Sequence, residues 1–237
     1  MRRYMCNPCG RRSACLKLTR FTLYFCGLNP RSVPGLVLLL SEGCLTSLSI
    51  SNNFTGILPD DQNPLLFDEP GGIAFGAALR ANKTLQVLHL QRVRLWDVLP
   101  VGLAVINGVV GHKMLVNFAL CSNEVAAENR QMVGDALGRL IAVQSALCTL
   151  TLPDCGLSDI GLRPIFQALP GNTNLHGLNL DGENDICTIE LAAEVLEAVR
   201  QNMSLQHLGC VAGKFPELDA AAAFVSQRLR EMRASRG

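Results

Sequence analysis

The stretch 147–174, LCTLTLPDCGLSDIGLRPIFQALPGNTN, holds the pattern that decides the fold of this chain. Leucines stand at offsets 0, 3 and 5 (Leu147, Leu150, Leu152), and a cysteine follows at offset 8 (Cys155). Offsets 3 and 5 show the period of two that is typical of a short strand with one buried face. The apolar period then changes to 3.6, which predicts a helix whose buried face carries Leu162, Ile165, Phe166 and Leu169.

The same strand and helix pattern recurs along most of the chain, about every 28 to 30 residues. Seven copies align, opening at Leu18, Leu45, Leu85, Leu115, Leu147, Leu175 and Leu205. A period of this length marks a stack of units, each of which buries its apolar face only against its neighbours. We therefore expect an α/β leucine-rich-repeat solenoid, a horseshoe with parallel strands on the concave face and helices on the convex face.

Small polar residues recur at two further positions of the repeat. At offset 8 we expect an inward side chain that satisfies backbone groups of the loop, and four residues suit this role: Cys26, Asn53, Asn123 and Cys155. Val93 and Glu183 occupy the same position in two other copies and break the pattern. An asparagine also follows several helices, where we expect the left-handed conformation that ends a helix, at Asn82, Asn172 and Asn202.

These motifs resemble the ribonuclease-inhibitor-type leucine-rich repeat proteins, whose unit reads LxxLxLxxCxLxxxGxxxLxxxLxxNxx. Residues 147–174 match that unit almost throughout, and residues 78–85 match the join between two units. The resemblance covers residues 18–210 and implies a non-enzymatic protein–protein interaction module, a scaffold or adaptor. Two alternatives stay open. One is a GTPase-activating protein of the Ran type, with Arg92 or Asn123 acting at the strand ends, although the tail here is basic where that type is acidic. The other is a fragment of a larger leucine-rich-repeat sensor protein.

We expect three parts in the chain. Residues 1–17 form a basic, cysteine-containing N-terminal segment, and residues 18–215 form a leucine-rich repeat domain of seven units. Within it, the second unit is longer than the others and carries a loop insertion at residues 58–72, rich in Asp, Pro and Gly. Residues 216–237 form a C-terminal capping helix and a basic tail, because one apolar stripe runs through this segment.

The distribution of charge argues against a nucleic-acid partner. Residues 1–41 hold seven basic and no acidic residues, whereas residues 42–227 hold ten basic and 19 acidic residues, a balance of −9. A uniformly basic face is therefore not expected. The apolar run 33–40 is far shorter than the roughly 18 residues of a membrane span, so we expect no membrane partner.

Cysteine usage favours a reducing compartment. Several of the ten cysteines occupy repeat positions that bury a lone thiol, and the chain shows no convincing secretory signal. We expect a cytoplasmic protein. A nuclear or mitochondrial location stays open, because the arginine-rich start has the composition of a mitochondrial targeting segment.

The candidate binding surface consists of offsets 2, 4 and 6 of each strand, which are mostly small and neutral. Its larger hydrogen-bonding members are Tyr24, His89, Gln91, Asn117, Asn179 and His207. This surface has neither the aromatic anchors of a high-affinity binding hot spot nor enough charge to produce a strong electrostatic field. We expect a protein partner of unknown identity, bound here or at the 58–72 insertion, and no small-molecule substrate or cofactor.

Two arrangements suggest chemistry, and neither is complete. Cys6, Cys9, Cys15 and Cys26 would supply four thiolates for zinc, but their spacing is irregular. Cys148 and His176 share offset 1 of adjacent strands, yet no orienting carboxylate falls into register. The three glycosylation sequons coincide with repeat positions, at Asn53, Asn82 and Asn202. We expect no metal site and no catalytic residue, and therefore no enzyme.

Overall fold

A single parallel sheet runs through the whole described part of the chain. The computed structural model describes residues 18–42, 44–53, 65–143, 145–210 and 214–234. In them, seven strands pair in sequence order. The strands are β1 (Arg20–Tyr24), β2 (Ser47–Ser51), β3 (Val87–Gln91), β4 (Asn117–Ala119), β5 (Thr149–Thr151), β6 (Gly177–Asn179) and β7 (His207–Gly209).

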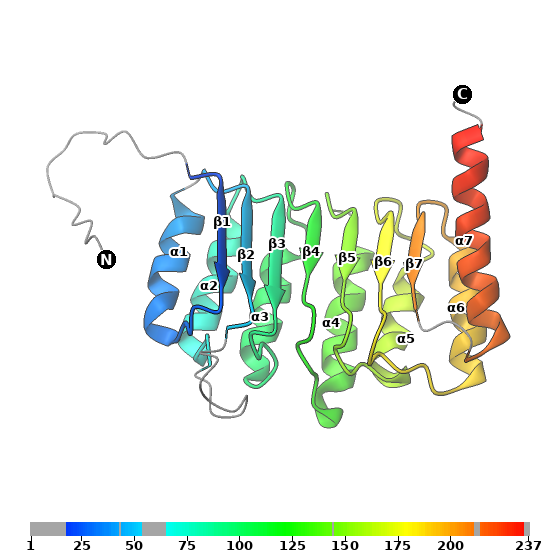
Figure 1. Ribbon diagram of the computed structural model, residues 1–237, viewed down its shortest axis with the longest axis horizontal. Helices are drawn as coiled ribbons and strands as arrows, with labels where there is room; N and C mark the ends of the chain where they lie inside the picture. Colours follow the sequence, from blue (N-terminus) through cyan, green and yellow to red (C-terminus); the bar gives the residue numbers. More distant parts are fainter. Residues whose placement is uncertain (1–17, 43, 54–64, 144, 211–213, 235–237) are drawn as a thin grey trace, which may run out of the picture.

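Helices alternate with these strands and cover one side of the sheet. Helices α1 to α6 lie behind it in the view of Figure 1, and α7 stands at its end beyond β7. They are α1 (Val33–Ser41), α2 (Glu69–Ala81), α3 (Leu99–Val109), α4 (Arg130–Ala142), α5 (Asp159–Ala168), α6 (Ile189–Gln201) and α7 (Pro216–Ala234). The short 3-10 turns Pro30–Ser32 and Ala127–Asn129 precede α1 and α4. No described helix is long and apolar enough to cross a membrane.

Strand register confirms the alignment of the repeats. The offset-3 residues are direct partners from strand to strand, in the order Phe21, Leu48, Leu88, Phe118, Leu150, Leu178 and Leu208. From Leu48 to Leu178 these side chains are 0% exposed, so they form one continuous apolar row under the helices. The α/β class and the parallel pairing predicted from the sequence are therefore confirmed.

Close helix contacts bring successive units together. A Cβ atom at Gly76 on α2 would lie 2.3 Å from the carbonyl oxygen of Ala104 on α3. A Cβ atom at Gly108 would lie 2.4 Å from the carbonyl oxygen of Gly76. Since no side chain fits at either position, glycine lets the two helices pack backbone to backbone.

The turns that leave the strands share one backbone conformation. In the first six copies the residue at offset 7 has a positive φ between 48° and 77°: Phe25, Asn52, Arg92, Ser122, Asp154 and Gly182. This left-handed residue redirects the chain, and in the second, fourth and fifth copies the following side chain points into the core. Asn53, Asn123 and Cys155 are there at most 4% exposed, as predicted.

These inward side chains bind the backbone of the preceding copy. Asn123 donates to the Leu90 carbonyl at 2.7 Å and accepts from the amides of Val93 and Leu95 at 3.1 and 3.2 Å. Asn53 makes the same kind of contact with both backbone groups of Leu28, each at 2.7 Å. The Cys155 thiol donates to the Leu120 carbonyl of the preceding copy at 3.1 Å and contacts the Pro153 carbonyl of its own turn at 3.5 Å.

In the sixth copy the contact is made one residue later than the sequence predicted. Glu183, aligned with offset 8, is exposed, and Asn184 is 2% exposed and points inward. Asn184 donates to the Leu152 carbonyl and accepts from the Leu157 amide at 3.0 Å. We call Asn53, Asn123, Cys155 and Asn184 the turn ladder. Strict counting of offsets missed Asn184 because this turn is one residue longer.

Cys26 was predicted to belong to this ladder, and that prediction is wrong. Its side chain is exposed. The cause is its place in the array: β1 is the first described strand, so no described copy lies before it for Cys26 to bind. Val93 is buried, but its apolar side chain offers the preceding copy no hydrogen bond.

A second set of polar side chains lies buried at the opposite edge, where helices end. Asn82 and Asn202 have extended backbones, with φ of −65° and −74°, so the left-handed conformation predicted for them is wrong. Each asparagine instead caps the turn with its side chain. Asn172 accepts from the amides of Asn174 and Leu175 and donates to the Ile141 carbonyl of the preceding copy at 2.6 Å.

His112 stands in the same position of the third copy, three residues before Leu115. Its Nδ1 accepts from the amides of Met114 and Leu115 at 3.2 and 3.0 Å. Its Nε2 is buried and has no hydrogen-bond partner among the described residues. Burial lowers the pKa of the ring, the charge of Lys83 lowers it further, and the Asn82 backbone opposes this in part. We call Asn82, His112, Asn172 and Asn202 the helix-end row.

Helix α7 closes the far end of the array. It contacts both α6 and β7, and it buries Leu218, Ala221 and Val225. Arg228 on this helix donates to the Val199 carbonyl at 3.0 Å and to the Asn202 carbonyl, at the last turn of α6. Burial lowers the pKa of its guanidinium group. An arginine thus satisfies carbonyls that a further copy would otherwise reach.

The segment predicted as an insertion, 58–72, lies partly outside the described residues. Two residues of its described part belong to the core, whereas Asp68, Glu69 and Pro70 are exposed. Leu66 and Phe67 are at most 3% exposed, and Phe67 packs against Phe75 with ring centroids 5.1 Å apart. Helix α2 already begins at Glu69, where Asp68 accepts from the Gly71 amide as N-cap.

Truncating a leucine of the buried row should destabilise the whole array. We expect Leu150→Ala or Leu178→Ala to lower the free energy of unfolding by about 2 to 5 kcal/mol, because each leaves a cavity. Thr151→Ala, on the other face of β5, is the matched control. Urea denaturation would measure all three; equal stability of Leu150→Ala and Thr151→Ala would contradict the register.

Asn184 and Glu183 provide a test of the turn ladder. Asn184→Ala leaves the Leu157 amide and the Leu152 carbonyl buried without this partner, which should cost about 1 to 3 kcal/mol. Glu183→Ala changes only an exposed side chain and should stay within about 0.5 kcal/mol of the parent protein. A thermal or urea melt in which Glu183→Ala is the more destabilised variant would place the ladder at Glu183 instead.

His112 should make stability depend on pH. Its pKa is lowered in the folded state, so the unfolded chain binds the proton more tightly. The stabilisation is therefore complete above about pH 6.5 and is lost as the pH falls below that value toward the folded-state pKa. His112→Asn restores the asparagine of the helix-end row and cannot be protonated. As the pH is lowered from 7.5 to 5.5, we expect the melting temperature of the parent to fall further than that of His112→Asn. A difference in melting temperature that does not change with pH would exclude His112 as the cause.

Candidate functional site

The side of the sheet that carries no described helix is the candidate site (Figure 1). We call it the open face. Strand pairing sorts its side chains into rows across the strands. One row holds Arg20, Ser47, Val87, Asn117, Thr149, Gly177 and His207, and the next holds Thr22, Ser49, His89, Ala119, Thr151, Asn179 and Gly209. Most of these side chains are small and neutral, so the face is a shallow polar surface.

Three of the predicted binding residues lie together on β3 and β4. His89 Nε2 and Asn117 Oδ1 are 3.3 Å apart and form a hydrogen bond between the two strands. Gln91 lies two residues beyond His89 on the same side of β3. All three side chains are partly exposed. They therefore present several hydrogen-bonding groups near the middle of the open face.

The other three predicted residues lie apart from this group. Tyr24 is 59% exposed on β1, where its ring meets Phe25 edge to face with centroids 4.4 Å apart. Asn179 on β6 accepts a hydrogen bond from the Asp181 amide at 2.9 Å, so its side-chain oxygen already serves its own turn. His207 on β7 lies four strands from His89, roughly 19 Å at the usual strand spacing. The six residues share one face and do not form one cluster.

Acidic side chains gather where β5 and β6 end, a feature that the sequence analysis did not single out. Asp154 follows β5, and Asp181 and Glu183 follow β6. The turns hold them close together, because Asp154 Oδ1 accepts from the Glu183 amide at 3.2 Å. Gly182 makes this approach possible: its φ is +77°, and a Cβ atom there would overlap Asp154 Oδ1. The acidic excess of residues 42–227 was the available signal, but only strand pairing brings these carboxylates together.

The sequence suggested one arrangement for metal binding and one for nucleophilic catalysis. Among them, no group of three or more His, Cys, Asp or Glu side chains is placed to bind a metal ion. Of the four cysteines considered as zinc ligands, Cys6, Cys9 and Cys15 lie outside the described residues. Cys148 and His176 are neighbours, since the His176 amide donates to the Cys148 carbonyl, but the thiol itself donates to the Ala146 carbonyl at 3.4 Å.

Cys155 and Asn123 are both buried in the core. Burial raises the pKa of Cys155 to about 12, so this thiol stays protonated at neutral pH. Asn123, weighed as a residue that acts on a nucleotide, is 0% exposed and bonded to the backbone on several sides. It cannot contact a bound nucleotide.

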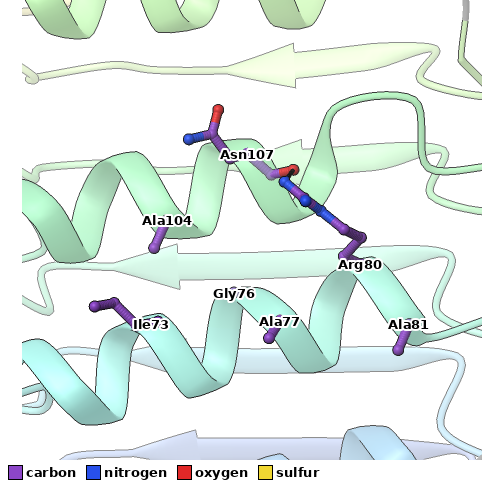
Figure 2. A pocket seen from close by; sticks show the side chains of 7 residues that line it. All are labelled: Ile73, Gly76, Ala77, Arg80, Ala81, Ala104 and Asn107. Carbon is purple, nitrogen blue, oxygen red and sulfur yellow. Dashed lines mark hydrogen bonds between the residues drawn. The ribbon is translucent and has the colours of Figure 1, made fainter.

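A shallow groove lies on the helix side, between α2 and α3. Figure 2 shows its lining, which consists of Ile73, Gly76, Ala77, Arg80, Ala81, Ala104 and Asn107. Arg80 reaches across one end and donates to the Asn107 carbonyl at 3.1 Å. Most of the lining is alanine, glycine and isoleucine, which offer no group for catalysis. The groove follows from the close packing of two helices through Gly76.

Solved structures with a similar fold exist. Actin-binding site 2 of leiomodin-1 matches with a TM-score of 0.52 at 15% identity, over 87% of this chain and 92% of its own. The tropomodulin C-terminal domain, from structural genomics of Caenorhabditis elegans, matches with a TM-score of 0.53 at 14% identity, over 86% of this chain and 96% of its own. No model of a known protein family matches the chain, and no curated protein sequence does. At such low identity the likeness establishes a leucine-rich-repeat-like fold alone.

Proposed function

We propose that this chain is a non-enzymatic protein-binding module that holds its partner on the open face of the sheet. One observation carries the proposal: the open face runs across all seven strands without a described helix on it. Parallel sheets are usually covered on both sides, so a face left to solvent is available for another molecule. A surface of this breadth suits a macromolecule better than a small ligand, which requires a concave pocket.

The side chains of this face indicate what kind of partner fits. His89, Gln91 and Asn117 provide donors and acceptors near its middle. The edge of the face where β5 and β6 end is acidic, with Asp154, Asp181 and Glu183. A partner would place polar groups over β3 and β4 and a basic side chain near the ends of β5 and β6. Tyr24 and His207, at opposite ends of the sheet, are further candidate contacts. With few aromatic anchors, this interface would be of modest affinity.

The fold likeness suggests a first partner to test. The leiomodin-1 structure is named for an actin-binding site, and it shares the fold over most of both chains. Actin is therefore a reasonable first candidate for this chain. The likeness concerns backbone arrangement at 15% identity and does not carry over any contact residue.

We further propose that the repeats are of the ribonuclease-inhibitor type, within a repeat domain at residues 18–215 and a capping helix and tail at 216–237. The use of Asn and Cys in the turn ladder and the period of the repeat support this assignment. The contact of α7 with α6 and β7 supports the capping role. The 58–72 segment remains a second candidate surface.

A pair of double variants tests the open face. His89→Ala/Asn117→Ala removes a hydrogen-bonded pair of side chains from the open face. Gln131→Ala/Asp135→Ala removes a similar pair, 2.9 Å apart, from the exposed side of α4 and is the control. Loss of two hydrogen bonds to a partner should weaken binding about tenfold. We expect only the first variant to show this loss.

Binding would be measured by cosedimentation with filamentous actin and by affinity purification with mass spectrometry, followed by titration of any captured protein. A partner whose affinity falls equally in both double variants would argue against the open face. No specific partner for the parent protein under either method would contradict the proposal as a whole. Circular dichroism would confirm that both variants are folded.

A further inference from the structure

The two ends of the sheet are finished differently. At the β7 end, α7 buries apolar side chains, and Arg228 bonds the last carbonyls of α6. At the β1 end, β1 pairs with β2 and with no other described strand. An unpaired strand edge is a template for another strand, and proteins usually cover or disrupt it.

The backbone groups of β1 that point away from β2 can be identified. The Ser47 amide donates to the Thr19 carbonyl at 3.0 Å, and the Phe25 amide donates to the Ser51 carbonyl at 3.4 Å. Backbone groups alternate in direction along a strand, so the odd-numbered residues from Thr19 to Phe25 face β2. The amide and carbonyl groups of Arg20, Thr22 and Tyr24 therefore point away from the sheet.

Apolar side chains are incompletely covered at the same edge. Phe21 and Leu23 are only partly buried, whereas their direct partners Leu48 and Ile50 on β2 are 0% and 1% exposed. Leu18, just before the strand, is 42% exposed, and Phe25, just after it, is 51% exposed. The outward backbone groups pair with no described strand, and the Tyr24 carbonyl makes only a 3.4 Å contact with the Cys26 thiol among the described residues. The edge thus combines these backbone groups with apolar surface, the two features that strand pairing satisfies together.

The sequence of β1, RFTLY, is complementary to itself when two copies run antiparallel about Thr22. In that register Thr22 faces Thr22, Arg20 faces Tyr24, and Phe21 faces Leu23 of the other copy. Phe21 and Leu23 lie on the helix side and meet apolar side chains, whereas Arg20 meets an aromatic ring on the open face. The outward backbone groups are those of Arg20, Thr22 and Tyr24, which are the groups that this register pairs.

We propose that β1 binds β1 of a second copy of this chain, forming a symmetric dimer in which the two sheets join into one. A two-fold axis perpendicular to the sheet passes beside Thr22. This rotation reverses the strand direction and keeps the same face up, so both sets of helices lie on one side and both open faces on the other. The contact is isologous, and it extends the open face across two copies.

Substitution of Thr22 separates edge pairing from folding. Thr22→Pro removes an outward amide that has no described partner within the chain, and proline is tolerated on edge strands. In the dimer it removes that amide from both copies at the centre of the interface. Thr22→Val keeps the amide and the β-branched shape and is the matched control.

Sedimentation equilibrium of the full chain would measure association from about 1 to 100 µM, a range suited to a small interface. We expect the parent and Thr22→Val to dimerise, and Thr22→Pro to dimerise at least about tenfold more weakly. Circular dichroism and melting at the lowest concentration would confirm that Thr22→Pro is folded. A monomeric parent at about 100 µM, or equal association of the proline and valine variants, would overturn the proposal.

Thr22→Glu gives an independent readout if proline disturbs the fold. The side chain at this position lies exposed on the open face, so the substitution should leave the monomer intact. In the dimer it would place two carboxylates opposite each other, about 5 Å apart, and weaken association. Salt should partly restore the dimer, because the screening length falls from about 10 Å at 0.1 M to about 3 Å at 1 M. Association that ignores both the charge and the salt would place the interface elsewhere.

Discussion

Most repeats of this chain leave backbone groups at their turns that a side chain of the next repeat satisfies. The turn ladder meets this need at one edge, as Asn123 does for Leu90, Val93 and Leu95. The helix-end row meets it at the other edge, as Asn172 does for Ile141. Because a buried unpaired backbone group costs about as much as a lost hydrogen bond, these contacts set the spacing and order of the repeats.

The same constraint explains the ends of the sheet. Where no further copy follows, Arg228 takes over the carbonyl contacts that a new repeat would make. Where no described copy precedes, Cys26 is exposed, and Phe21 and Leu23 are only partly covered. A closed end limits growth of the array, whereas an open end keeps the capacity to pair, which is the basis of the proposed dimer.

Covering the sheet on one side only separates stability from binding. The buried leucine row faces the helices, and the open face is left with side chains that the core does not need. These positions can therefore vary with the partner. Their small, neutral character and the acidic side chains where β5 and β6 end suit a protein surface. Cys155 and His112 are both held by backbone contacts.

The repeat, its register, the α/β class and the side of each strand that faces water can all be predicted from the amino-acid sequence, because periods of two and 3.6 depend only on local geometry. It correctly placed Leu150, Asn123 and Cys155 in the core. Three features become visible only in the folded chain: Asn184 replaces Glu183, Cys26 is exposed, and His89 bonds Asn117 while His207 lies far away. These features depend on turn length, on what lies beside a strand and on which strands are neighbours. Contacts between residues about 30 positions apart in the sequence are determined by how the repeats pack, and the local period of apolar residues carries no information about them.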